Sequence, residues 1–156
     1  MTIAVNEIAG SGPASVSSGN VSFDASDTTK DNLLLFVAGV NGSSSYQLTS
    51  PAEGWTERVN TLEGSGTLSG ERLYVYSRVA GESEDTHQFD FGSGYKSWSF
   101  LEISGTDGTI ESVEIDSVSG SDYSFASQSH DSGDASLLCF GAGNSGNTQA
   151  FTAPTN

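Results

Sequence analysis

The sequence is poor in several residues that mark particular classes of protein. Its 156 residues include one cysteine, one methionine, three prolines and five basic residues. A single cysteine, Cys139, excludes a disulfide within the chain, and its apolar neighbours indicate a buried thiol rather than a nucleophile. The longest apolar run, Leu33 to Val40, is too short to cross a bilayer as a helix, and the first residues are not a signal peptide. We therefore expect a chain that is soluble as made and folds in a reducing cytoplasm.

Positive charge is scarce, whereas negative charge is abundant. Five Lys and Arg face twenty Asp and Glu, the formal net charge is -15, and no basic residue follows Lys96. Nucleic acids and anionic membranes are bound largely through Lys and Arg, so neither is expected as a partner. A net charge of this sign mainly indicates solubility, and the partners that it favours are a basic protein surface or a divalent cation.

The apolar residues alternate with polar ones at a period of two, which is typical of strands. The run Leu33–Val40 is apolar throughout, as expected of a strand buried on both faces. In Glu71–Val79, Tyr74 and Tyr76 share one face and aliphatic side chains share the other. We expect further strands near residues 3–5, 21–23, 89–91, 95–103, 110–115, 123–125 and 137–140, and one that starts at Trp55.

This pattern predicts an all-β protein, a single-domain antiparallel β-sandwich that is jelly-roll-like and has roughly eight to ten strands. We assign residues 1–18 to an N-terminal strand and candidate attachment arm, and residues 19–156 to the sandwich domain. The pattern leaves room for one short helix near Thr28–Asp31.

No motif of a catalytic site occurs in the sequence. The two histidines, His87 and His130, lie far apart along the chain, and no serine has the Gly-x-Ser-x-Gly context of a nucleophile elbow. Glu82, Glu84 and Asp85 fall in a predicted turn, where a solvated acidic loop is favoured over a pair of catalytic carboxylates. We predict no enzymatic activity. The alternative is a hydrolase with a jelly-roll fold, which needs a cleft with convergent carboxylates.

No cofactor is expected, and calcium is the one metal left open. Asp24 with Asp27, or the acidic turn at residues 82–85, supplies some of the oxygens that calcium prefers, but neither fits an EF-hand. One cysteine and two scattered histidines disfavour zinc.

Four aromatic residues are candidates for an interface: Tyr74, Tyr76, Tyr95 and Trp98. Large aromatic side chains dominate burial both in cores and at interfaces. Core packing is the first interpretation, a subunit interface is the second, and a sugar-binding platform is the third.

The sequence resembles a β-sandwich module that is common in virion proteins of tailed bacteriophages. The resemblance covers most of the chain between Asp31 and Phe140, with Lys30 in place of the expected glycine. It is carried by four segments of strand and turn: Asp31–Ala38, Pro51–Thr56, Leu73–Ala80 and Leu101–Asp107.

The resemblance implies a non-enzymatic structural protein on the virion surface, made in the host cytoplasm. Two roles are compatible with it. The first is a capsid decoration (cement) protein that bridges and stabilises subunits of the major capsid protein, and the shortness of the chain favours this role. The alternative is a tail or fibre module that binds host-surface carbohydrate. Either role predicts a homo-oligomer, and a trimer is favoured.

Overall fold

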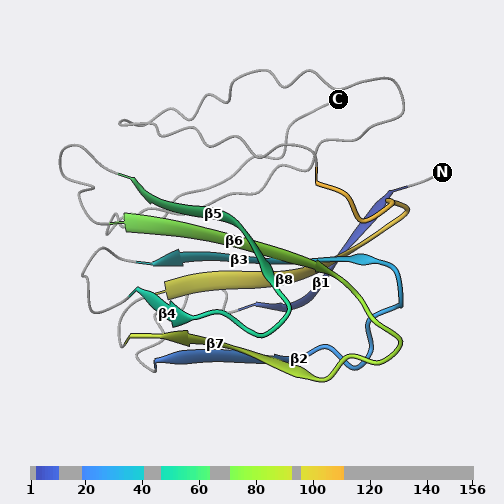
Figure 1. Ribbon diagram of the computed structural model, residues 1–156, viewed down its shortest axis with the longest axis horizontal. Coiled ribbons are helices and arrows are strands. Elements are labelled where there is room, and N and C mark those ends of the chain that lie inside the picture. The colour runs from blue at the N-terminus through green and yellow to red at the C-terminus, as the bar shows by residue number, and fades with distance from the viewer. Residues whose placement is uncertain (1–2, 11–18, 41–46, 64–70, 93–95, 111–156) are drawn as a thin grey trace, which may run out of the picture.

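The computed structural model describes residues 3–10, 19–40, 47–63, 71–92 and 96–110. In these ranges the chain forms strands and turns, and none of the described residues forms a helix that could cross a membrane. Two antiparallel sheets pack face to face (Figure 1), so the predicted all-β sandwich is confirmed. The strands are β1 (Ala4–Gly10), β2 (Asn20–Asp24), β3 (Leu33–Val40), β4 (Leu48–Ser50), β5 (Thr56–Glu63), β6 (Glu71–Val79), β7 (Thr86–Phe91) and β8 (Lys96–Ser104).

The strand order is that of a jelly roll with one strand moved. The larger sheet has the order β1-β8-β3-β6-β5, and the smaller sheet has the order β2-β7-β4. The first four strands and the last three alternate between the two sheets, as two interleaved Greek keys require. Only β5 departs, because it pairs with β6 in the larger sheet instead of lying beside β4 in the smaller one.

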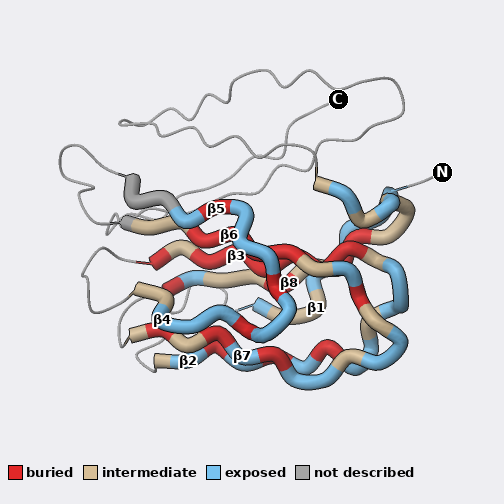
Figure 2. Tube along the Cα trace, viewed as in Figure 1, coloured by how far each residue is buried: buried red, intermediate tan, exposed pale blue. Residues whose placement is uncertain are grey.

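Strand β3 lies in the middle of the larger sheet, between β6 and β8. Leu34 and Phe36 point into the space between the sheets, whereas Leu33 and Leu35 belong to a cluster on the opposite face. All four side chains are buried (Figure 2). An uninterrupted apolar run is what a strand in this position needs, so the prediction for residues 33–40 is confirmed.

Stacked aromatic rings fill the space between the two sheets. The Phe23 and Phe100 ring centroids are 4.2 Å apart, and those of Phe36 and Phe89 are 4.0 Å apart. Trp55 meets Phe89 edge-on, with the ring centroids 5.4 Å apart. Aromatic pairs of this kind contribute about 0.5–1.5 kcal/mol each beyond the burial of their area. The rings therefore join the smaller sheet firmly to the larger one.

The outer face of the larger sheet carries a second apolar cluster. Its buried members are Leu33, Leu35, Val37, Val59, Val75 and Ile103. After β8 the chain turns through Gly105 and Gly108, each with a φ of 78°, and Ile110 packs against this cluster. The larger sheet is therefore apolar on both faces, and the smaller sheet covers only one of them.

The N-terminal strand that the sequence predicts is present: Ala4–Gly10 pairs with β8 along its length, apart from a bulge between Glu7 and Ala9, and forms an edge strand of the larger sheet. The rest of the candidate arm, residues 11–18, lies outside the described residues. Thr28–Asp31 forms turns and not a helix, and Asp31 has a φ of 67°. The strands expected at 110–115, 123–125 and 137–140 fall on or run into residues outside the described ranges, as do His130 and Cys139.

Candidate functional site

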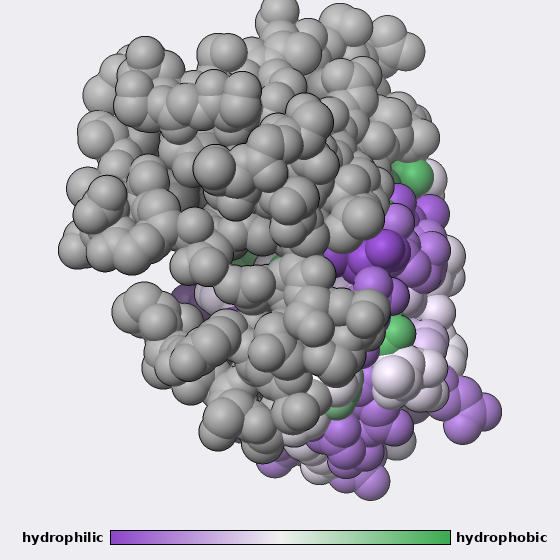
Figure 3. All heavy atoms as spheres, turned by 90° about the vertical axis from the view of Figure 1, so that its left-hand side faces the viewer, coloured by the Kyte–Doolittle hydropathy of each residue, from purple (hydrophilic) through white to green (hydrophobic). Residues whose placement is uncertain are grey.

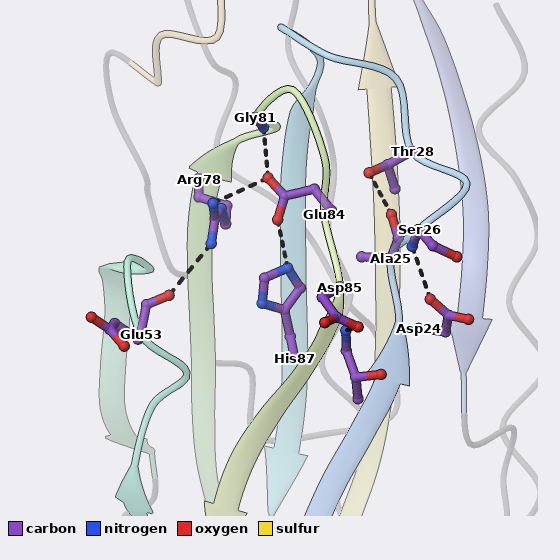
Figure 4. Close-up of polar contacts among 11 residues, drawn as sticks. Asp24, Ala25, Ser26, Thr28, Glu53, Arg78, Gly81, Glu84, Asp85 and His87 are labelled. Carbon is purple, nitrogen blue, oxygen red and sulfur yellow. Dashed lines mark hydrogen bonds and ion pairs between the residues drawn. The ribbon is translucent and has the colours of Figure 1, made fainter.

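The turn between β6 and β7 holds a buried carboxylate, Glu84, whose side chain is 3% exposed. Its Oε1 accepts hydrogen bonds from the backbone N–H of Gly81 at 2.6 Å and from Nη2 of Arg78 at 3.1 Å. Its Oε2 lies 2.9 Å from Nε2 of His87. Arg78, Gly81 and His87 thus surround the carboxylate (Figure 4). Through these three partners the buried carboxylate connects the end of β6, the turn and the start of β7.

His87 enters this cluster from β7 and is itself buried. Its ring lies between Trp55, at a centroid distance of 5.4 Å, and Phe23, at 5.9 Å. Burial lowers the pKa of His87, and the hydrogen bond with Glu84 opposes that shift only in part. The imidazole is therefore neutral near pH 7, and its Nε2–H donates to Glu84.

Arg78 neutralises the charge of Glu84 and reaches beyond it. Its Nη1 donates to the backbone carbonyl of Glu53 at 3.4 Å, which connects β6 to the turn before β5. Its Nε is buried and has no hydrogen-bond partner among the described residues. The Arg78 side chain is 24% exposed, so one part of the guanidinium serves the buried cluster while another part faces outward.

A shallow pocket opens beside Arg78, with a volume of about 230 Å³. Arg58 and Thr56 of β5 line it together with Ser77 and Arg78 of β6. The remaining wall comes from Gly54, Val79 and Gly108. The pocket is thus a polar hollow that contains two of the five basic residues of a strongly acidic chain.

The hydrogen bonds of His87 and Glu84 bear on whether this cluster could activate a nucleophile. Within the described ranges, no Ser, Thr or Cys side chain forms a hydrogen bond with His87. Oε1 of Glu84 accepts hydrogen bonds from Arg78 and Gly81, and Oε2 lies against His87, so both carboxylate oxygens are already engaged. The chemistry that these residues support is ion pairing and hydrogen bonding.

A second buried carboxylate, Glu102, lies on the core face of β8, at the opposite end of that strand from Lys96. Its Oε1 accepts hydrogen bonds from the Thr29 backbone N–H and the Asn32 side chain, each at 2.7 Å. Lys96 is 3% exposed, burial lowers its pKa, and its Nζ lies 5.5 Å from the centre of the Phe91 ring. Glu102 and Lys96 therefore lie at the two ends of the aromatic core, and each charged group has contacts there that hold it in place.

The structure places the candidate interface aromatics mainly in the core. Tyr74 and Tyr76 are 1% and 3% exposed, and burial raises the pKa of both hydroxyls. The Tyr74 hydroxyl accepts from the backbone N–H of Leu48, and the Tyr76 hydroxyl donates to Glu57. Trp98 is half-buried and packs against the core cluster. Tyr95 lies outside the described residues. Side chains as buried as Tyr74 and Tyr76 cannot form an exposed shelf for sugars.

The acidic turn differs from the predicted solvated loop. Glu82 is exposed and pairs with Lys30, whereas Glu84 is buried, so the two carboxylates do not converge. Asp24 accepts a hydrogen bond from the backbone N–H of Ser26, which lowers the pKa of Asp24. Among the described residues, no three or more His, Cys, Asp or Glu side chains come together as metal ligands.

The sequence contained a signal for this site that pattern reasoning missed. Glu84 and His87 are three residues apart around the start of a strand, and Arg78 is the last residue but one of the strand before it. Arg58 left no signal in the sequence, because a charged residue at a polar position of a strand is ordinarily a solvent-facing one. Comparison of the chain with protein-family models, with curated proteins and with solved structures gave no match.

Proposed function

We propose that this chain is a non-enzymatic structural protein that acts through surface contacts, as a capsid decoration protein on a tailed phage. The observation that carries the proposal is the jelly-roll strand order of the two sheets. Jelly rolls recur in viral capsid and lectin domains, so this support is an analogy at the level of the fold. The resemblance of the strand and turn segments to phage virion modules supports the same role.

The sandwich has properties that suit a rigid surface component. The aromatic side chains in the described part of the chain pack into the core cluster between the sheets, and the buried carboxylates fix turns, so the framework holds its outer groups in constant positions. The described part of the side shown in Figure 3 is largely hydrophilic, with small separate hydrophobic spots. Such a surface suits contacts made by a few positioned groups and repeated over many copies, because linked weak contacts gain strength through avidity.

In this role the chain binds the major capsid protein and bridges neighbouring coat subunits. A trimer is proposed, because a closed ring presents the same surface to several coat subunits at once. Each bound copy favours the assembled shell over its dissociated subunits by mass action.

Cryo-electron microscopy of particles assembled with and without the chain tests this role. Added density on the capsid lattice, together with faster breakage of bare particles on heating, is expected. Density at the tail tip would refute the decoration role and favour the carbohydrate-binding alternative. Absence of the chain from particles would refute both virion roles.

A further inference from the structure

We propose that the pocket between β5 and β6 binds a carboxylate group, namely an acidic side chain of the protein on which the chain docks. Binding of a carboxylate is inferred from the positions of Arg58 and Arg78 in the pocket. The assignment of the carboxylate to a coat protein rests on the proposed function above.

Arg58 is held in place for binding. It lies at the bulge of β5, where the register with β6 shifts between Glu57 and Val59. Its Nε donates to the Ser77 hydroxyl at 2.7 Å, and Ser77 is 1% exposed and therefore fixed. No ion pair joins Arg58 to an acidic side chain in the described part of the chain. A guanidinium that is oriented through its Nε, and whose terminal amino groups have no partner among the described residues, is suited to a planar carboxylate, which it meets with two parallel hydrogen bonds.

The charges around the pocket favour a group with a single negative charge. Arg58 and Arg78 contribute two positive charges, and the buried Glu84 that pairs with Arg78 offsets one of them. A carboxylate cancels the remaining charge. A phosphate dianion would exceed it, and the surrounding net charge of -15 would repel the excess.

Two glycines allow the pocket walls to come close together. Gly54 and Gly108 both have a φ of 78°. A Cβ at Gly54 would lie 3.3 Å from Nη1 of Arg78, and a Cβ at Gly108 would lie 2.7 Å from Cγ2 of Val79. The volume of about 230 Å³ is below the roughly 300–1,000 Å³ of sites for whole small molecules. A side-chain-sized group therefore fits better than a nucleotide or a cofactor.

Such a pocket would set the position of a docked partner. Most of the surface of an acidic chain repels acidic groups, and a partner carboxylate gains attraction at the pocket that Arg58 and Arg78 line. Like-charge repulsion elsewhere disfavours other orientations, which makes this contact a determinant of specificity.

A titration of the full chain with N-acetylglutamate N-methylamide tests the pocket. Binding is monitored by NMR through the arginine Nε–Hε signals. The wild-type chain is expected to bind the probe saturably, and Arg58→Gln is expected to weaken binding by about tenfold or more. Arg72→Gln is the matched control, because Arg72 lies on the neighbouring strand β6 and its Nη1 donates to Asn60 outside the pocket. Unfolding midpoints in urea show that each variant is folded. Equal binding by wild type and Arg58→Gln would overturn the pocket, as would inorganic phosphate binding more than tenfold tighter than the carboxylate.

Binding to particles tests the source of the carboxylate. If a coat carboxylate enters the pocket, Arg58→Gln reduces occupancy on particles at least tenfold, whereas Arg72→Gln leaves it unchanged. Unchanged occupancy of Arg58→Gln, with the small carboxylate no longer bound, would overturn the coat protein as the source. Failure of every variant, wild type included, to attach would refute the decoration role, while the titration would still decide whether the pocket binds a carboxylate.

Discussion

Replacement of Glu84 by alanine removes the acceptor that the β6–β7 turn shares among Arg78, Gly81 and His87. Removal of one partner from a buried ion pair costs about 3–5 kcal/mol. The Arg78 side chain is 24% exposed and regains some hydration, so the lower end of that range applies. We expect the free energy of unfolding to fall by about 3 kcal/mol. For a chain of this length the corresponding fall in Tm is about 6–12 °C.

Urea unfolding followed by tryptophan fluorescence measures this loss, because Trp55 packs against His87. Glu82→Ala is the control in the same turn. Glu82 is 82% exposed and pairs with the half-exposed Lys30, so its loss is expected to cost less than about 1 kcal/mol. If Glu84→Ala loses no more than Glu82→Ala, the buried carboxylate does not hold the turn and this reasoning is wrong.

Three further predictions concern other buried groups. Burial lowers the pKa of His87 below its usual 6.5, so the unfolded chain takes up protons before the folded chain does, and stability is expected to fall as the pH drops through 6.5. In His87→Gln the urea midpoint should depend less on pH between pH 7.5 and 5, and an unchanged dependence would exclude His87 as the cause. Glu102→Ala leaves the Asn32 side chain and the Thr29 backbone N–H without their acceptor, and it is expected to lower the free energy of unfolding by about 2 kcal/mol. Glu102→Gln keeps an acceptor oxygen and should cost less in urea unfolding, so equal costs would show that charge rather than hydrogen bonding matters. Gly108→Ala is expected to lower the free energy of unfolding by about 2 kcal/mol, because alanine is strained at the left-handed φ and its Cβ would clash with Val79. An unchanged Tm in calorimetry would contradict this.

Strands that are defined by their own side chains could be predicted from the sequence. Leu33–Val40 is continuous in apolar residues, and in Glu71–Val79 the two tyrosines alternate with aliphatic residues that pack on the opposite face, so the sequence of both strands contains their arrangement. Strand β4, Leu48–Ser50, was not predicted because it has three residues and is not itself apolar. Its strand conformation comes from pairing with β7.

The candidate site depended on tertiary contacts that periodicity does not contain. An acidic turn at residues 81–85 has the composition of a solvated loop, and only the approach of Arg78 and His87 makes burial of Glu84 favourable. Glu102 did leave a local signal. It follows Trp98 and Phe100 on the same face of β8, so alternation already assigned a charged residue to a core position. A charge at such a position indicates a buried partner.

The pairing of β1 with β8 has a consequence for synthesis of the chain on the ribosome. Ala4 lies opposite Ser104, so the edge strand finds its partner only after about a hundred more residues have been added. At about 5–20 residues per second, the first strand waits roughly 5–20 s with its backbone groups unpaired. Contacts so distant along the chain also slow the folding step itself. During that interval, exposed strand edges on nascent chains can pair with one another, and the acidic residues that repel neighbouring copies would then limit aggregation.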